Sequence, residues 1–386
     1  MPSRLFRSRT TRPLLVGFVA AVTALVTTAG PIAPTPPASA EAPSVSVTPV
    51  VEDLTIPWDV TWVGPVMLFN QRGGGIWSKR GAAAPKKVSM PLPKVYAKGE
   101  SGMLGLVADP KAASNGYFYS CMAVATAKGK AKDIEVWKWR LVSDTSATKV
   151  KKLVTGIPLA SSGRHSGCRL RFRSAEMLYI GTGDAAQGKV PQNLKSLGGK
   201  VLRVRSSGSI PKSNPFYAKG GKARYVWTYG HRNVQGIAFR SSAGQIWSVE
   251  HGTDRDDEVN LIAKGGNYGW SPTPGYNEKR SMTDKKRFPK ARSAKWRSGR
   301  PTVATSGAAF LTGSQWGDWD GRLAVAMLKG EGVKVFTLSG DSIVEQQTIL
   351  TAYGRIRTVQ QGPDAALYFT TSNGSGTDGI YRVTRR

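Results

Sequence analysis

Six pairs of short apolar runs recur along the chain. Within each run, bulky apolar or aromatic residues alternate with small or polar ones, and turn residues such as Gly, Pro, Asp and Ser stand in the links. Such alternation over roughly four to eight residues is typical of a β-strand with a buried face, so each pair predicts an antiparallel hairpin. The expected strands pair 58–62 with 66–70, 103–107 with 116–120, 169–172 with 177–181, 236–239 with 245–249, 307–310 with 322–326, and 356–359 with 366–370.

Repetition of one hairpin unit indicates a repeat architecture. Residues 41–386 leave about 58 residues for each of six units, which is enough for a four-stranded blade. We therefore predict an all-β fold in which these residues form a single six-bladed β-propeller with four antiparallel strands per blade. The runs 134–139 and 333–336 would be outer strands, and the run 44–47 would be the outer strand of the last blade and close the ring. A β-sandwich would explain the strands but not the sixfold repeat.

The N-terminal 40 residues have a different pattern. Residues 1–12 carry four arginines and no acid, an apolar run follows from Leu14 to Val26, and a Pro-rich stretch ends in Ala-Ser-Ala at Ala40. This order predicts a secretory signal peptide cleaved near Ala40, with the mature protein secreted or at the exterior of the cell envelope and not inserted in a membrane. An uncleaved membrane anchor is the alternative.

The charge of the chain is strongly positive. Its 55 Lys and Arg residues against 25 Asp and Glu give a net charge of +30, and removal of residues 1–40 leaves +26 (51 minus 25). The densest basic stretch runs from Lys279 to Arg300. Such a surface could attract an anionic cell-wall polymer, an acidic glycan or an acidic electron acceptor, or it could be a solvated loop. Nucleic acid is not expected as a partner of an exported protein.

Two cysteines and three histidines limit the chemistry. Export would place Cys121 and Cys168 in an oxidising compartment, where they form either a disulfide or two unpaired buried thiols. Spacings typical of zinc or copper sites, of a dinucleotide-binding loop and of a P-loop are absent from the sequence. A nicotinamide enzyme or a nucleoside triphosphatase is therefore not expected.

Unusual polar residues stand where the predicted hairpins begin and end. In an antiparallel hairpin, the residue that enters the first strand and the residue that leaves the second lie at the same end. These positions should therefore gather on one face of the propeller and form a candidate site. They include His165, Asp184, 231–235, 250–252, Lys329, Arg355 and 371–372.

This constellation favours base catalysis next to an anionic ligand. His165 can remove a proton near neutral pH, and Asp184 could orient its ring and stabilise the imidazolium. Arg232, Lys329, Arg355 and Arg357 would bind carboxylates. Because Arg355 and Arg357 alternate along a strand, they are expected to share one face. A propeller hydrolase or lyase and a non-catalytic binding propeller are the rival classes, and the first is disfavoured because, apart from Asp184 and Glu250, the face is poor in acids.

The chain resembles the soluble glucose/sorbosone dehydrogenases. The most specific motifs are Gly-His-Arg-Asn-Val-Gln-Gly at 230–236 and Gly-Gly-Asn-Tyr-Gly-Trp at 265–270, and the likeness extends from Pro57 to the C-terminus. The resemblance implies a six-bladed propeller that oxidises aldoses with pyrroloquinoline quinone (PQQ) and calcium. Further matching segments are 165–170, 181–184, 197–203, 214–216, 250–252, 257–262, 354–359 and 362–364.

By this resemblance, His165 would deprotonate the anomeric hydroxyl, Asp184 would support it, and Arg232 would stabilise charge on the quinone carbonyl. The side chains that would hold the cofactor are Arg232, Asn233, Gln235, Lys329, Arg355 and Arg357.

The resemblance also implies metal and sugar ligands. The main-chain carbonyls of Gly252 and Thr253 would bind the cofactor calcium, and Glu258 with the carbonyl of Tyr268 would bind a second calcium. The substrate-contacting glutamine would be Gln187 or Gln192.

Three positions depart from the family pattern. Thr253 stands where Pro is usual, Cys168 replaces a Gly beside the base, and Thr358 replaces an acid that often follows the paired arginines. Cys168 could fix its loop through Cys121. These changes could lower cofactor affinity. The alternative function is a non-catalytic propeller that binds an anionic cell-wall polymer or glycan.

Overall fold

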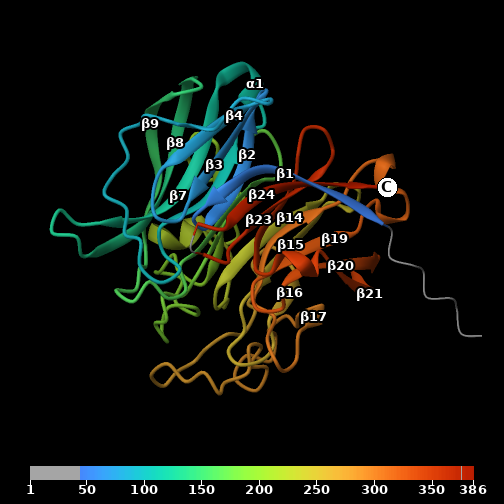
Figure 1. Cartoon of the computed structure of the whole chain (residues 1–386). Helices are drawn as coiled ribbons and strands as arrows, with labels where there is room; N and C mark the ends of the chain where they lie inside the picture. Colours follow the sequence, from blue (N-terminus) through green and yellow to red (C-terminus); the bar gives the residue numbers. More distant parts are fainter. Residues whose placement is uncertain (1–43, 375) are drawn as a thin grey trace, which may run out of the picture. The chain divides into compact units, whose positions relative to one another are not determined.

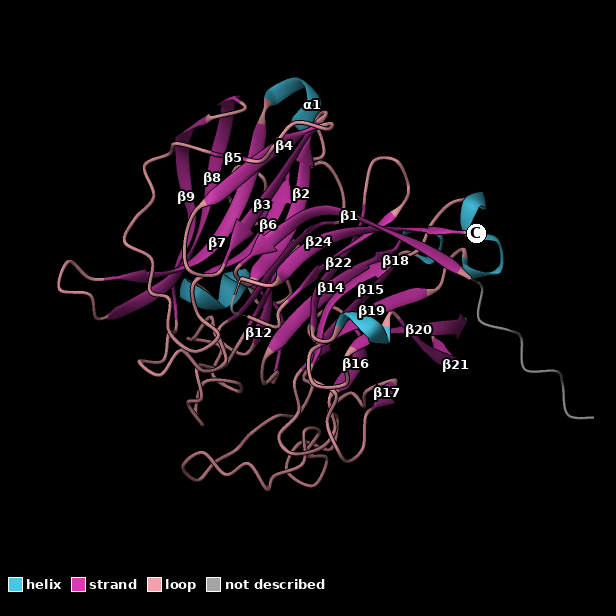
Figure 2. Ribbon diagram, viewed as in Figure 1, coloured by secondary structure: helices cyan, strands magenta, loops and turns pink. Residues whose placement is uncertain are grey.

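The computed structural model describes residues 44–374 and 376–386, which form six four-stranded antiparallel sheets (Figures 1 and 2). The predicted signal peptide, residues 1–40, lies outside the described residues. Among the described residues, the helices are single short turns, and none is long and apolar enough to cross a membrane.

Each sheet is one blade, numbered here in chain order. Blade 1 comprises β2 (Pro57–Val63), β3 (Val66–Gln71), β4 (Ile76–Arg80) and β5 (Lys86–Lys87); blade 2 comprises β6 (Met103–Ala108), β7 (Tyr117–Ala125), β8 (Ala131–Ser143) and β9 (Ser146–Ile157); blade 3 comprises β10 (Gly167–Phe172), β11 (Met177–Thr182), β12 (Lys200–Arg205) and β13 (Val226–Tyr229). Blade 4 comprises β14 (Val234–Arg240), β15 (Gln245–Glu250), β16 (Glu258–Leu261) and β17 (Trp296–Arg297); blade 5 comprises β18 (Thr305–Phe310), β19 (Leu323–Met327), β20 (Gly332–Ser339) and β21 (Ser342–Ile349); blade 6 comprises β22 (Ile356–Gln361), β23 (Leu367–Thr371), β24 (Asp378–Arg385) and β1 (Val45–Leu54). The short helices are α1 (Ala112–Asn115), η1 (Tyr217–Lys219), η2 (Gly221–Tyr225), η3 (Ser241–Ala243), η4 (Ser314–Trp319) and η5 (Thr351–Tyr353).

The six blades close into a ring. The first strands of the blades, β2, β6, β10, β14, β18 and β22, contact one another in that order, and β22 contacts β2. The N-terminal strand β1 pairs with the C-terminal strand β24, with Val47 opposite Val383 (Figure 1). The six-bladed propeller, all six hairpins and the closing role of residues 44–47 are therefore confirmed.

Apolar layers between neighbouring blades hold the ring together. Between blades 4 and 5, for example, Trp247 and Val259 pack against Phe310 and Phe336, and all four are buried. Burial of these alternate side chains is the reason that the two-residue period of the sequence predicted the strands.

A disulfide joins two blades beside the candidate site. Cys121 on β7 is bonded to Cys168 on β10, with their Cα atoms 6.1 Å apart. The structure therefore has a disulfide and not two free thiols.

The first strand of each blade carries a register shift near its beginning. In β10, β14 and β22 the shift falls at Cys168, Gln235 and Arg357, respectively. A bulge interrupts the alternation of side chains and redirects the bulged residue. The alternation that predicted a shared face for Arg355 and Arg357 is therefore interrupted at Arg357. Arg355 is partly exposed before β22, whereas Arg357 is buried over the ring of Trp58, 4.0 Å from its centroid.

Candidate active site

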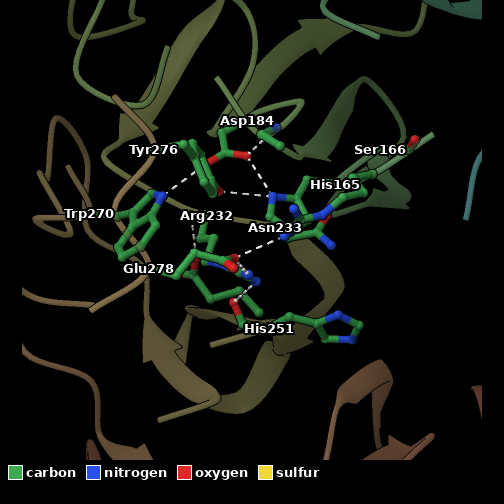
Figure 3. Close-up of polar contacts among 12 residues, drawn as sticks. His165, Ser166, Asp184, Arg232, Asn233, His251, Trp270, Tyr276 and Glu278 are labelled. Atoms are coloured by element: carbon green, nitrogen blue, oxygen red, sulfur yellow. Dashed lines mark hydrogen bonds and ion pairs between the residues drawn. The ribbon is translucent and has the colours of Figure 1, made fainter. Parts of the chain in front are cut away.

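The site begins with a histidine and a carboxylate from the two ends of one hairpin. His165 precedes β10 and Asp184 follows β11, and His165 Nδ1 lies 2.8 Å from Asp184 Oδ1 (Figure 3). His165 has a φ of 54°, and Ala185 after Asp184 has a φ of 53°, both in the left-handed region. A Cβ on Gly183 would lie 1.9 Å from the carbonyl oxygen of His165, so only glycine permits this approach.

Asp184 is held by four donors. Its Oδ1 accepts hydrogen bonds from His165 Nδ1 and from the backbone N–H of Ala186, each at 2.8 Å. Its Oδ2 accepts from Trp270 Nε1 at 2.8 Å and from the hydroxyl of Tyr276 at 2.7 Å (Figure 3). Because Nδ1 of His165 is held by Asp184, Nε2 is the ring nitrogen that remains for a substrate.

Arg232 lies next to this pair at the start of blade 4. Its backbone carbonyl accepts from the N–H of Asp184 at 2.8 Å, and its Nη1 donates to the carbonyl of His251 at 3.2 Å. Its Nη2 lies 2.6 Å from Glu278 Oε1, which also receives Arg164 Nη2 at 2.9 Å. Burial alone would raise the pKa of Glu278, but the hydrogen bond and charge of Arg232 hold it below the ordinary value.

A second row of polar groups crosses from blade 2 to blade 6. Glu100 accepts from Asn233 Nδ2 at 3.2 Å, from Gln235 Nε2 at 3.4 Å and from the backbone N–H of Ser166. Gln235 Oε1 in turn accepts from Arg357 Nη1 at 3.4 Å. Burial, with the charges of neighbouring arginines, lowers the pKa of Arg357 to about 9, although the charge of Glu100 opposes this change.

These groups surround a cavity of about 310 Å³, which is lined by Glu100, Arg164, His165, Arg232, Asn233, His251, Gly252, Thr253, Asp257, Thr302 and Ala304. Three buried nitrogens in or beside it have no partner among the described residues, namely Nε of Arg232, Nε of Arg357 and Nε2 of His251. The two arginine nitrogens are donors, and unpaired buried donors are costly unless a ligand or water binds them. The site therefore suits a polar, anionic ligand.

The acids here are more numerous than the sequence indicated, since Glu100, Asp257 and Glu278 join Asp184 and Glu250 at this end of the ring. Each is nevertheless engaged by donors. Asp257, for example, accepts backbone N–H groups from Gly252 at 2.8 Å, from Val303 at 2.7 Å and from Ala304 at 2.6 Å.

The calcium positions predicted by resemblance have the expected donor types. The carbonyls of Gly252 and Thr253 accept no hydrogen bond from any described residue, and both residues line the cavity. Glu258 is buried beside Glu250, and burial followed by this like charge raises its pKa to about 8. The described residues hold no cluster of three or more His, Cys, Asp or Glu that could bind a metal, so a cation at either position would need carbonyl oxygens as ligands.

Several predicted residues are not brought to the cavity. Lys329 is exposed, and Arg355 donates to the carbonyls of Ser372 and Leu328 instead. The amide of Gln192 is used within the protein, since it bonds the amide of Asn267 in both directions and the carbonyl of Trp270.

Gln187 is exposed in the turn after Asp184, and no described residue binds its side-chain amide. Of the two glutamines that the sequence left as alternatives, Gln187 is therefore the one that remains free for a ligand.

A family model for glucose/sorbosone dehydrogenases matches residues 54–382. The chain belongs to this family. An aldose sugar dehydrogenase of Escherichia coli (strain K12) is 33% identical over 351 residues, which cover 86% of this chain and 91% of that protein. The resemblance stated from the motifs is thus confirmed.

Solved structures of family members have the same fold. The apo-form of the soluble aldose sugar dehydrogenase of E. coli superposes with a TM-score of 0.80, at 30% identity, over 89% of this chain and all of that one. The PQQ-bound form of an aldose sugar dehydrogenase from Streptomyces coelicolor gives a TM-score of 0.72 at 27% identity, over 89% of this chain and all of that one.

The sequence did not identify four side chains of this family member's site. These are Glu100, Trp270, Tyr276 and Glu278, which lie on loops far from His165 along the chain. The sequence offered two signals for these residues. Trp270 ends a family motif, and Tyr276 and Glu278 lie just before the basic stretch 279–300.

Proposed function

We propose that this protein is a PQQ- and calcium-dependent aldose dehydrogenase that oxidises the anomeric carbon of a sugar to the lactone. The observation that carries the proposal is the His165–Asp184 pair at a cavity lined by Arg232, whose buried Nε lacks a partner among the described residues. Family membership and the PQQ-bound relative support it.

His165 acts as the general base in this proposal. The anomeric hydroxyl donates its proton to His165 Nε2, and Asp184 stabilises the imidazolium that forms through its contact with Nδ1. Asp184 is itself held by four donors, so the ring orientation is set before the sugar enters. The exposed amide of Gln187, in the turn beside Asp184, is the candidate hydrogen-bonding group for the sugar.

The residues present fit the cofactor. Arg232, Asn233, Gln235 and Arg357 offer guanidinium and amide groups to its carboxylates and carbonyl oxygens, and the Nε atoms of both arginines are unpaired and buried. When bound, PQQ supplies the two-electron acceptor that the side chains of the chain lack. Lys329 and Arg355 would contribute only after their side chains turned from their present positions.

Calcium would be held by hard oxygen ligands. The free carbonyls of Gly252 and Thr253 would bind the ion that accompanies the cofactor, and Glu258 with the carbonyl of Tyr268 would bind a second ion. A cation at Glu258 would compensate a carboxylate that burial otherwise disfavours.

Reconstitution tests the proposal. Purified protein is incubated with PQQ and calcium and assayed for dye reduction with a panel of aldoses, with His165→Ala as the matched inactive variant. PQQ- and calcium-dependent dye reduction by the parent, and retained PQQ binding without turnover by His165→Ala, are expected. Absence of PQQ binding by the parent would contradict the proposal.

The alternative is a binding propeller for an anionic cell-wall polymer or glycan. One observation favours such a contact in addition to catalysis: Lys279, Lys285, Lys286, Lys290 and Arg292 are exposed on one loop and form no ion pair with any described residue. Export beyond the cytoplasm, which this partner requires, remains a prediction from the N-terminal sequence.

A further inference from the structure

The loop between β16 and β17 places a tyrosine hydroxyl against both members of the catalytic pair. Tyr276 Oη lies 2.9 Å from His165 Nδ1 and 2.7 Å from Asp184 Oδ2 (Figure 3). The ring of Tyr276 packs against the edge of Trp270, with centroids 6.1 Å apart, and is tilted toward the ring of His165 at 5.8 Å.

The donors and acceptors available on these side chains determine the direction of each hydrogen bond. Trp270 Nε1 can only donate, so Asp184 Oδ2 is an acceptor. The hydroxyl of Tyr276 has one proton, and the shorter, charge-assisted bond to Oδ2 takes it. The oxygen of Tyr276 can then only accept from His165, which requires a proton on Nδ1. In the neutral ring, Nε2 is therefore unprotonated.

We propose that Tyr276 is a positioning residue for the His165 base: its hydroxyl donates to Asp184 and accepts from His165 Nδ1, and so holds the imidazole with Nε2 free for a proton. The inference rests on the proposed function, since it assigns Tyr276 to the same base. It adds a side chain from blade 4 to a pair that blade 3 supplies.

Two further observations support a fixed position for this hydroxyl. Two residues along the loop, Glu278 binds Arg164 and Arg232, so the segment is tied to the site at two points. Burial, and then the charge of Asp184, raise the pKa of Tyr276, which keeps the hydroxyl a donor at any working pH.

Losing the hydroxyl has two opposing effects on His165: it removes an acceptor from Nδ1–H, which lowers the pKa of His165, and a donor from Asp184, which raises it. Because the bond to Asp184 is shorter and charge-assisted, we expect the second effect to be the larger one. Without this donor, negative charge concentrates on Asp184 Oδ2, and the Asp184–His165 bond strengthens. Tyr276→Phe should therefore raise the pKa of His165 by about 0.5–1 unit. The charged and titratable groups around the ring, which the variant leaves in place, are Asp184, Arg164, Arg232, Glu100, Glu278 and His251.

The test uses the apo protein. With only three histidines in the chain, ¹⁵N-histidine labelling and long-range ¹H–¹⁵N spectra can report the tautomer and the pKa of His165 directly. The parent should show the Nδ1–H tautomer. Tyr276→Phe and Tyr276→Ala should show the same upward shift in pKa, because the hydroxyl and not the ring is responsible.

Two internal controls accompany these variants. His231, bonded to Glu250 on the same face, should not shift, and Asn277→Ala, on the same loop, should behave as the parent. An unchanged or lowered pKa of His165 in Tyr276→Phe, or an Nε2–H tautomer in the parent, would overturn the proposal.

Kinetics supply a second readout. In the reconstituted enzyme, Tyr276→Phe should lower kcat about tenfold at neutral pH, with KM within twofold, and should move the acidic limb of kcat/KM upward by the same 0.5–1 unit. A rise in KM with unchanged kcat would overturn the positioning role. If the NMR shift occurs but neither the parent nor any variant oxidises a sugar, the proposed function is wrong. The role of Tyr276 in positioning the ring of His165 is then still supported.

Discussion

Two histidine–carboxylate pairs lie at the ends of the first hairpins of neighbouring blades, although at different register positions, and only one of them lines the cavity described above. His165 and Asp184 in blade 3 are 19 residues apart, as are His231 and Glu250 in blade 4, and each pair has an Nδ1–O distance of 2.8 Å. His165 lines the cavity, whereas His231 is fully buried, with Nε2 bonded to Thr228 Oγ1 at 2.9 Å. Neighbouring hairpin ends thus hold an accessible histidine, the proposed base, in one blade and a buried histidine in the next.

The backbone differs between the two pairs as well. His165 has a φ of 54° and lies three residues before the disulfide-bonded Cys168, whereas His231 is not among the described residues with a positive φ. The ring of His231 is also stacked on Tyr268, with centroids 4.5 Å apart. Strained backbone is commonly found at functional sites, and here it accompanies the accessible pair.

The largest expected effect is a difference in turnover between variants of the two histidines. His165→Gln should reduce the turnover of reconstituted enzyme by about 10²- to 10⁴-fold with little loss of stability, because it removes the proposed base. His231→Gln should instead destabilise the fold by roughly 3 kcal/mol, because Glu250 stays buried with one partner fewer. Steady-state kinetics and denaturant unfolding of both variants measure this, and similar rate losses in both would refute the division.

The Cys121–Cys168 disulfide is expected to stabilise the loop of His165 and not that of His231. The double variant Cys121→Ser/Cys168→Ser should lose about 4 kcal/mol of unfolding free energy, since the bond closes a loop with a sequence separation of 47. The loop of His165 should also loosen, so kcat should fall several-fold, while the His231 resonances stay in place. Equal midpoints for the oxidised parent and the variant in guanidinium unfolding would contradict this expectation.

Glu258 lies beside Glu250 of the buried His231–Glu250 pair, and a bound metal ion would neutralise its charge. Glu258→Gln should raise the stability of the calcium-free protein, because burial and Glu250 disfavour the charge. The same variant should lose the stabilisation contributed by the second calcium, which for the parent would be about 2.7 kcal/mol at 100 times its dissociation constant. Thermal midpoints with EDTA and with calcium test both statements. A calcium shift in Glu258→Gln as large as in the parent would place the second ion elsewhere.

The smallest expected effect is the loss of stability when the hydrogen bond to Nε2 of His231 is removed. Thr228→Val removes the hydroxyl partner of Nε2 and should cost about 1–2 kcal/mol, since a buried acceptor is left unpaired. Turnover should remain within twofold of the parent, because this histidine is not exposed to substrate. Thr228→Ser, which keeps the hydroxyl, is the matched control. A tenfold loss of rate in Thr228→Val alone would link the buried pair to catalysis.

The sequence predicted the strands better than the site. Alternation identified all six hairpins, and the hairpin rule placed His165, Asp184 and Arg232 at one end of the ring. Alternation cannot assign Arg355 and Arg357 to a face, because the bulge at Arg357 interrupts it. Lys329 lies after the end of β19, as predicted, but its side chain is exposed. A position at a strand end does not determine where a long side chain points.

The sequence alone determined the repeat, the ring closure by residues 44–47 and the placement of His165 and Asp184 at one end of a hairpin, because these follow from local alternation and strand pairing. Only the tertiary structure decided which pair is accessible and which loops complete it. Glu100, Tyr276 and Glu278 reach the site from distant loops, where no periodic pattern constrains a side chain. Their placement depends on how blades 2 and 4 pack around blade 3, and packing between distant segments leaves no local signature in the chain.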